Sequence, residues 1–203
     1  MKLPVTAFLV GVLALAGAAA AHAAALVGAT APDFTLTDSK GGQHSLSALR
    51  GKWVVLEWVN YECPFVKKHY SSGNLPGLQK AYTAKGVVWL AINSSAPGKQ
   101  GNFPPAEIES RSQANGAAFT AYLVDEEGTV GRAYGAKTTP HMFVIDPKGT
   151  LVYAGGIDDI ASTDVEDLKT AKNFVRLALD EAMAGKKVST PSSAPYGCSV
   201  KYR

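Results

Sequence analysis

The feature that most constrains this chain is a strand-like run that gives way to a helical pattern at a single cysteine. Residues 53–59 (WVVLEWV) are almost continuously apolar and β-branched or aromatic, which is typical of a buried strand. Pro64 suits the first position of a helix, because its missing N–H costs nothing there. Cys63 is therefore predicted at the helix N-cap, where unpaired backbone N–H groups and the helix dipole stabilise a thiolate.

Two interpretations of Cys63 follow. A lone cysteine in an apolar stretch is commonly a small buried hydrophobe, whereas a cysteine at the start of a helix is suited to act as a nucleophile. Lys67 and Lys68 add positive charge one turn further on, while Glu62 opposes them. We interpret Cys63 as the reactive thiol. We predict a lowered pKa for it, because the helix N-terminus and the two lysines outweigh Glu62.

The beginning of the chain predicts export. An apolar segment at 3–21 closes on a small-residue cleavage signature at 21–23 (AHA), so residues 1–23 are interpreted as a secretory signal peptide. An uncleaved anchor is the alternative, since the apolar run is nearly long enough to span a bilayer. Cleavage would leave residues 24–203 as one domain, periplasmic or secreted, without stable membrane association. The net charge of +3, with Lys and Arg scattered, argues against nucleic-acid binding.

The remaining chain alternates strand and helix patterns, which predicts an α/β fold. A short edge strand is expected around Phe34 and Leu36. Strands are predicted at 53–59, 87–92, 122–125, 142–146 and 150–155, and helices at 64–70, 75–85, 107–116, 130–134 and 164–184. A Ser/Pro-rich tail then leads to Cys198, the only other cysteine.

Several motifs in this order resemble the redoxins. Residues 31–34 (APDF) with 46–52 (LSALRGK) are similar to the opening of alkyl hydroperoxide reductase and thiol-specific antioxidant proteins. Residues 135–140 (GAKTTP) resemble the cis-proline loop of thioredoxins. Residues 60–67 (NYECPFVK) and 196–202 (YGCSVKY) together resemble the peroxiredoxin-like subgroup. The resemblance implies a thioredoxin-like fold with a central mixed sheet flanked by helices, a C-terminal helix and a tail.

The chain departs from the patterns of thioredoxins and peroxiredoxins around Cys63. A thioredoxin carries a second cysteine three residues on, which releases the substrate, but that position here is Val66. A typical peroxiredoxin has proline and threonine where this chain has Leu56 and Asn60. Cys63 therefore resembles the attacking thiol of a thioredoxin with no resolving thiol nearby, and Cys198 becomes the candidate for that role.

The resemblance also implies roles for three further residues, which complete the predicted catalytic set with the two cysteines. Glu57 stands where thioredoxins keep a buried carboxylate; burial would raise its pKa and let it exchange a proton with the attacking or leaving sulfur. A cis Thr139–Pro140 bond would place the Thr139 backbone beside Cys63, where an extended substrate can pair with it.

Three classes of function stay open, of which a redox-inert binding domain is the least favoured. The preferred one is a cofactor-free thiol oxidoreductase: Cys63 attacks a disulfide or a peroxide, and Cys198 resolves the product in a disulfide whose formation moves the tail from about Pro191 onward. Its partners would be a thiol or disulfide protein, or a peroxide. A one-Cys peroxidase with a structural Cys198 is a variant of this reading. The non-enzymatic alternative is copper binding, because thiolates of Cys63 and Cys198 with the imidazole of His141 suit Cu(I).

Overall fold

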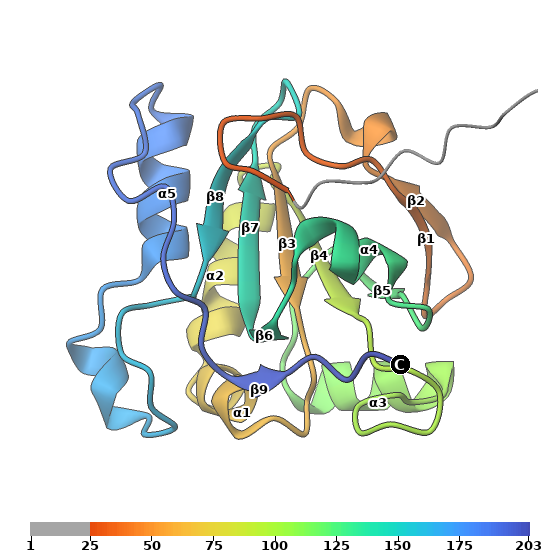
Figure 1. Cartoon of the computed structure of the whole chain (residues 1–203). Coiled ribbons are helices and arrows are strands. Elements are labelled where there is room, and N and C mark those ends of the chain that lie inside the picture. The colour runs from red at the N-terminus through yellow and green to blue at the C-terminus, as the bar shows by residue number, and fades with distance from the viewer. Residues whose placement is uncertain (1–24) are drawn as a thin grey trace, which may run out of the picture.

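A computed structural model describes residues 25–203; the predicted signal peptide and its cleavage site lie outside the described residues. The elements run through the chain as follows (Figure 1): β1 (Thr35–Asp38), β2 (Gln43–Ser45), the 3₁₀ turn η1 (Ser47–Leu49), β3 (Val54–Trp58), α1 (Pro64–Ser71), α2 (Asn74–Thr83), β4 (Val88–Asn93), α3 (Pro105–Ala114), β5 (Ala121–Val124), α4 (Thr129–Tyr134), β6 (Thr138–Thr139), β7 (His141–Ile145), β8 (Leu151–Gly155), the 3₁₀ turn η2 (Glu166–Lys169), α5 (Phe174–Met183) and β9 (Cys198–Ser199).

A seven-stranded mixed sheet in the order β2-β1-β5-β4-β3-β7-β8 forms the centre. The strands β3, β4 and β5 run parallel, β7 lies antiparallel to β3, and β1 lies antiparallel to β5. In the middle of the sheet, Leu56 of β3 is in register with Leu90 on one side and Phe143 on the other. The predicted α/β class, with a central mixed sheet flanked by helices, is confirmed.

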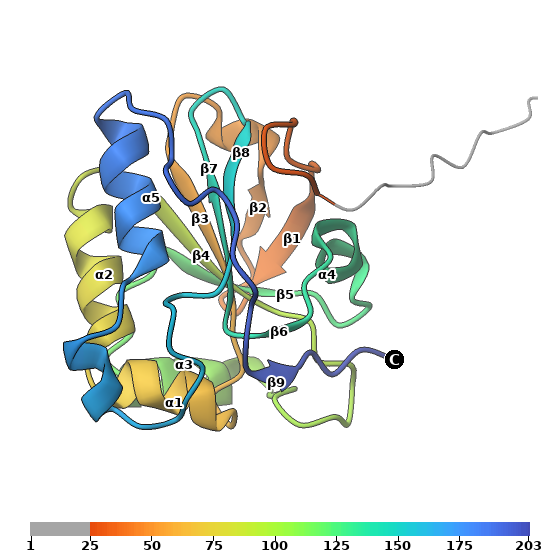
Figure 2. The ribbon, with the colours of Figure 1, turned by 60° about the vertical axis from the view of Figure 1, so that its left-hand side comes forward.

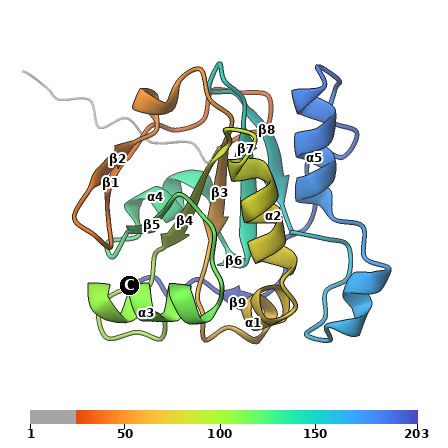
Figure 3. The same ribbon diagram turned by 180° about the vertical axis from the view of Figure 1, so that it is seen from behind.

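Alternation along β3 and β4 sends successive side chains to opposite faces, and both faces are covered. Val55 and Trp89 belong to the core under α2 and α5, whereas Leu56 and Leu90 belong to the core under α4. Figure 3 shows α2 against the back of the sheet, and Figure 2 shows α2 and α5 together on the side opposite α4. No helix within residues 25–203 is both long and apolar enough to span a bilayer.

The carboxyl ends of β3 and β4 lie at the same end of the sheet, and α1 and α3 follow there. The C-terminal tail descends from α5 past β8 to this end of the sheet (Figure 1). There β9 pairs with β6 in a separate two-stranded sheet, visible at the bottom of Figure 2. Segments from the start, the middle and the end of the fold therefore converge at the position of Cys63.

The predicted helix at 164–184 is wrong over its first half. The structure has the short turn η2, then a break, and α5 begins only at Phe174. Asn173 forms an antiparallel bridge with Asp158 and caps α5 by accepting the backbone N–H of Arg176, 2.9 Å away. The side chain of Asp159 accepts the backbone N–H of Lys172. These local bonds compete with helix continuation, as capping residues do.

The strand expected around Phe34 is present as β1, but it is not at the edge. The strand β2, which the sequence did not predict, pairs with β1 and forms the true edge. Gln43–Ser45 is short and polar, so it shows little of the apolar alternation on which the prediction depended. A short polar strand is also the kind that protects a sheet edge against further pairing.

Candidate active site

Cys63 is the N-cap of α1 and Pro64 is the first residue of that helix, as predicted. The extended strand β3 delivers the chain to this point, and the backbone carbonyl of Cys63 accepts the N–H of Lys67 at 2.9 Å, which starts the helix. The Cys63 side chain has no exposed surface. Its Sγ donates a hydrogen bond to the carbonyl oxygen of Thr139, 3.1 Å away.

The Thr139–Pro140 peptide bond is cis, as predicted, and its loop faces Cys63. Besides its carbonyl, Thr139 brings a hydroxyl to the sulfur. This Oγ1 is buried and has no hydrogen-bond partner among residues 25–203. The Thr139 side chain helps to lower the pKa of Cys63, so this hydroxyl is a candidate donor to the deprotonated sulfur, whereas the carbonyl accepts from the protonated thiol.

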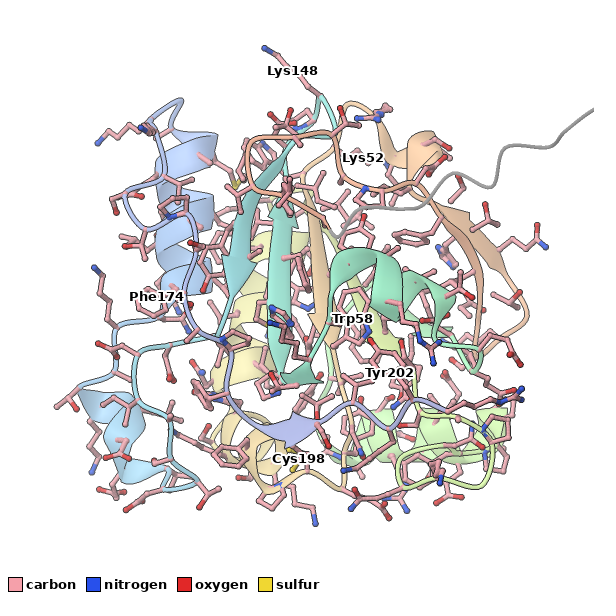
Figure 4. The ribbon with its side chains drawn as sticks, viewed as in Figure 1. Lys52, Trp58, Lys148, Phe174, Cys198 and Tyr202 are labelled. Atoms are coloured by element: carbon pink, nitrogen blue, oxygen red, sulfur yellow. The ribbon has the colours of Figure 1, made fainter. Side chains whose placement is uncertain are left out.

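Cys198 reaches Cys63 through the tail. Thr139 is paired with Cys198 and Thr138 with Ser199 in the antiparallel β6–β9 ladder. The side chains of the two cysteines lie within hydrogen-bonding range of each other, and both are free thiols. Figure 4 labels Cys198 at the end of the sheet where α1 begins. Two cysteines from opposite parts of the sequence are thus brought together.

The two thiols differ in acidity. Burial, the largest single effect, raises the pKa of Cys63, but the Cys198 side chain, the N–H groups of Val66 and Cys198, and Thr139 together hold that pKa below its usual value. Burial and the neighbouring Cys63 raise the pKa of Cys198 to about 11. These directions favour the thiolate at Cys63 and the protonated thiol at Cys198.

The pKa of Cys63 is lowered in the predicted direction, and the start of α1 contributes as predicted, but the predicted contribution of the lysines is absent. Lys68 is buried and its Nζ lies 3.3 Å from the carbonyl oxygen of Ile160 and 3.5 Å from Ser162 Oγ, so its charge is engaged elsewhere. The groups that favour the thiolate are instead the start of α1 and the residues of β6 and β9. The sequence shows the first of these and not the others.

We expect the thiolate absorbance of Cys63 in the ultraviolet, taken as the difference between the wild-type chain and Cys63→Ser, to inflect below about pH 8.5, the usual cysteine pKa. In Cys198→Ala the inflection should move up, because the foremost of the groups that favour the thiolate is removed. Lys67→Ala is the matched control and should leave the inflection where it is. A wild-type inflection at or above the usual value would contradict the assignment of Cys63 as the nucleophile.

Glu57 is fully buried, as predicted, among three hydrogen-bond donors. Tyr70 Oη lies 2.8 Å from one carboxyl oxygen, and Gln79 Nε2 and Trp89 Nε1 lie 2.9 Å and 2.7 Å from the other. Burial raises the pKa of Glu57 although these donors oppose it. Among the described residues, its hydrogen bonds go to these side chains and not to Cys63. Proton exchange with the sulfur stays a prediction.

His141 does not complete a copper site with the two cysteines. Its Nδ1 accepts the backbone N–H of Lys137 at 3.3 Å, and its ring packs on Phe143 with a centroid separation of 4.4 Å. Burial, with a contribution from Lys137, lowers the pKa of His141 to about 4. Between residues 25 and 203, no three or more His, Cys, Asp and Glu side chains are grouped closely enough to hold a metal ion.

A partly buried chain of hydrogen bonds, with His69 and Asp158 at its buried centre, anchors the tail, and the sequence does not reveal it. Asn74 Nδ2 lies 2.8 Å from His69 Nδ1, His69 Nε2 lies 3.1 Å from Tyr196 Oη, and Tyr196 Oη donates to Asp158 Oδ1 at 2.5 Å. These partners assign the proton of the neutral ring to Nε2. Burial, followed by the nearby charge of Lys68, lowers the pKa of His69 to about 3. In the sequence, only the two tyrosines that flank Cys198, Tyr196 and Tyr202, indicate that the tail is anchored.

The sequence model of the AhpC/TSA family matches residues 27–154, a segment that contains Cys63, Thr139 and Pro140. The chain belongs to the AhpC/TSA family. The resemblance to redoxins is thereby confirmed. The matched segment ends before α5 and the tail, so Tyr196, Cys198 and Asp158 lie outside it, whereas His69 and Asn74 lie within it.

This AhpC/TSA protein is 34% identical over 128 residues to thiol-disulfide oxidoreductase ResA of Geobacillus kaustophilus, a match covering 63% of this chain and 68% of the relative. A hypothetical protein from Sinorhizobium meliloti is similar in structure, with TM-score 0.73 and 28% identity over 89% of this chain and 97% of that one. An uncharacterized conserved protein from Geobacillus kaustophilus gives TM-score 0.74 and 29% identity, covering 88% and 93%. The structural likeness thus extends well beyond residues 27–154.

Proposed function

We propose that this AhpC/TSA protein is an exported thiol-disulfide oxidoreductase in which Cys63 attacks and Cys198 resolves. The observation that carries the proposal is the meeting of the two free thiols at the cis-proline loop, one favoured as thiolate and the other protonated. The name of the ResA relative supports the same reaction class. The predicted signal peptide supports a location in the periplasm or outside the cell.

The proposed reaction is a pair of thiol-disulfide exchanges. The Cys63 thiolate attacks one sulfur of a substrate disulfide, forms a mixed disulfide and releases the other substrate sulfur as a thiolate. Cys198 then loses its proton and attacks Cys63, which releases the second substrate thiol and leaves a Cys63–Cys198 disulfide. The substrate gains two electrons and the protein loses two. An external dithiol reductant restores the two cysteines. Glu57 is the candidate for carrying the proton.

A disulfide suits this site better than a peroxide. The positions at which a typical peroxiredoxin has proline and threonine are Leu56, which is buried in the core under α4, and Asn60, whose amide faces the loop around Gly101. Neither residue contributes a group that orients a peroxide beside the sulfur. The cis-proline loop, in contrast, presents backbone that can pair with a polypeptide.

The docked tail supports a conformational change before the substrate reaches Cys63, and not when the Cys63–Cys198 disulfide forms. Cys198 already adjoins Cys63 in the reduced protein, so the disulfide between them forms without moving the tail far. Cys63, however, has no exposed surface, and a substrate reaches it only when the tail leaves. Ser192 bridges Ala154 of β8, and Ser193 Oγ contacts Tyr153 Oη at 2.7 Å. We infer that the mobile part begins after Ser193.

The proposal is tested by mapping disulfides after reaction with a peptide disulfide. We expect digestion and mass spectrometry of the wild-type chain to show a Cys63–Cys198 bridge and both peptide thiols released. In Cys198→Ser the peptide should remain attached to Cys63. If no bridge forms and Cys198→Ser turns over like the wild type, the resolving role is wrong.

A further inference from the structure

The tail lies in its site as a peptide lies in a binding groove. Besides the two paired positions of β6 and β9, Val200 donates its N–H to the carbonyl of Lys137 at 3.0 Å. On the other side of the tail, the carbonyl of Lys201 accepts the N–H of Ala96 at 2.9 Å. Main-chain hydrogen bonds from two loops therefore hold an extended segment, which is how sheet-edge sites bind peptides.

Tyr196, two residues before Cys198, lies in surroundings that suit a tyrosine, with an aromatic contact for its ring and polar partners for its hydroxyl. The ring of Tyr196 packs edge-on against Phe65, with centroids 5.8 Å apart. Its hydroxyl joins buried His69 and Asp158, and the second carboxyl oxygen of Asp158 has no hydrogen-bond partner among the described residues. A phenylalanine would fill the same space but leave these polar groups without their partner, which is costly when they are buried.

The residue immediately before Cys198 has to be glycine. Gly197 has φ +136°, a conformation that favours glycine. A Cβ atom at this position would overlap the carbonyl oxygen of Thr139. The groove brings backbone against backbone here, so any side chain would push Cys198 away from Cys63.

A second tyrosine, four residues after Cys198, occupies a slot over α4. Tyr202 Oη donates to the carbonyl of Ala136 at 2.9 Å, and the guanidinium of Arg132 lies 4.8 Å from the ring centroid. Gly128 and Gly131 make room for the ring, since a Cβ on either would collide with it. Figure 4 shows Tyr202 below α4 and to the right of Cys198.

We propose that this groove binds extended polypeptide segments with a tyrosine two residues before a cysteine and a glycine between them, and that the tail occupies it as an internal competitor. The inference rests on the proposed function in that the cysteine of the bound segment is the one presented to Cys63. A partner polypeptide displaces Tyr196–Arg203 and takes over the same main-chain bonds and tyrosine pockets. The groove thereby selects substrates by the sequence around their cysteine.

The test measures binding without thiol chemistry. The probe is a fluorescent synthetic peptide with the sequence of residues 194–203, in which serine replaces the cysteine, and its affinity is measured by fluorescence anisotropy. A tethered occupant competes at a high effective concentration, so we expect the peptide to bind the full-length Tyr196→Ala chain at least about tenfold more tightly than the wild type. Tyr202→Ala should also bind it more tightly. Lys148→Ala, on the turn at the opposite end of the sheet (Figure 4), should match the wild type.

Two altered peptides test recognition on the Tyr196→Ala chain. Replacing the first tyrosine by phenylalanine should weaken binding at least about tenfold, and replacing the glycine by valine should abolish it. The inference would be overturned if the unaltered probe and the two altered peptides bound with equal affinity. It would also be overturned if the probe bound neither the Tyr196→Ala chain nor the Tyr202→Ala chain. Because the probe has no thiol, a chain that binds it but reduces no disulfide would refute the proposed function alone. A chain that reduces small disulfides but binds no peptide would refute the groove alone.

Discussion

Replacing Cys198 by serine is expected to stop this protein after one chemical step, whereas Cys63→Ser is expected to lower the rate to the uncatalysed background. Cys63 can still attack a substrate disulfide in Cys198→Ser, but no second thiol is present to release the mixed disulfide. Rapid-mixing measurements of released thiol should therefore show a burst of about one equivalent per chain and then no further turnover.

The chain itself offers a sharper version of this experiment. Val66 is buried in the first turn of α1, and its N–H is among the groups that favour the Cys63 thiolate. Adding Val66→Cys to the Cys198→Ser chain places a thiol three residues after Cys63, the spacing that thioredoxins use, and turnover should return. Val66→Ala in the same background is the matched control and should not restore it. Continuous turnover by Cys198→Ser without any second change would show that Cys198 is not the resolving thiol.

Replacing Glu57 by alanine is expected to cost about 3–5 kcal/mol in the free energy of unfolding, the largest stability effect we predict for a single residue near the site. Three buried donors, on Tyr70, Gln79 and Trp89, would lose their shared acceptor. Urea denaturation of reduced protein measures this cost. Glu57→Gln keeps the volume and one carbonyl oxygen, so its loss should be smaller. A change below about 1 kcal/mol in Glu57→Ala would contradict the importance of this network.

The raised pKa of Glu57 also predicts how stability depends on pH. Its folded pKa lies above the unfolded value of about 4.3, so between the two values the folded chain holds more protons than the unfolded chain. The free energy of unfolding should therefore fall as pH rises through this range, by up to about 1.4 kcal/mol per pH unit. Glu57→Gln should lack this decline. Parallel pH profiles for the two chains would show that Glu57 does not titrate in this way.

The local sequence was enough to predict the position of Cys63 at the start of a helix, but it was insufficient to predict which residues surround the sulfur. Cys63 at the start of α1 follows from a run of seven residues, six of them apolar, and one proline, because a strand end and a helix start are both short-range properties. The buried state of Glu57 and the cis bond before Pro140 followed from resemblance to thioredoxins. The pairing of β6 with β9 depends on a path from α5 to the opposite end of the sheet, and no pattern near Cys198 records that path.

The errors have the same origin. The helical spacing of apolar residues between 164 and 184 is present in the sequence, but the bridge between Asp158 and Asn173 interrupts the helix. His69 was assigned no role from the sequence, and its partners are Asn74 of α2 and, far away in the sequence, Asp158 in the loop after β8 and Tyr196 in the tail. The lysines after Cys63 suggested an electrostatic role, yet Lys68 is engaged by a loop nearly a hundred residues away. Long-range contacts decided each case.

The separation of the β6–β9 ladder from the seven-stranded sheet has a kinetic consequence. Because the tail adds no strand to the main sheet, it can detach while the core stays folded, which makes its release a local fluctuation rather than global unfolding. Amides of Cys198 and Val200 should then exchange with solvent sooner than those of β3 and β4. At high substrate concentration the reaction rate would stop rising when it equals the rate of tail detachment. The maximal turnover rate would then be limited by tail detachment and would be the same for different disulfide substrates.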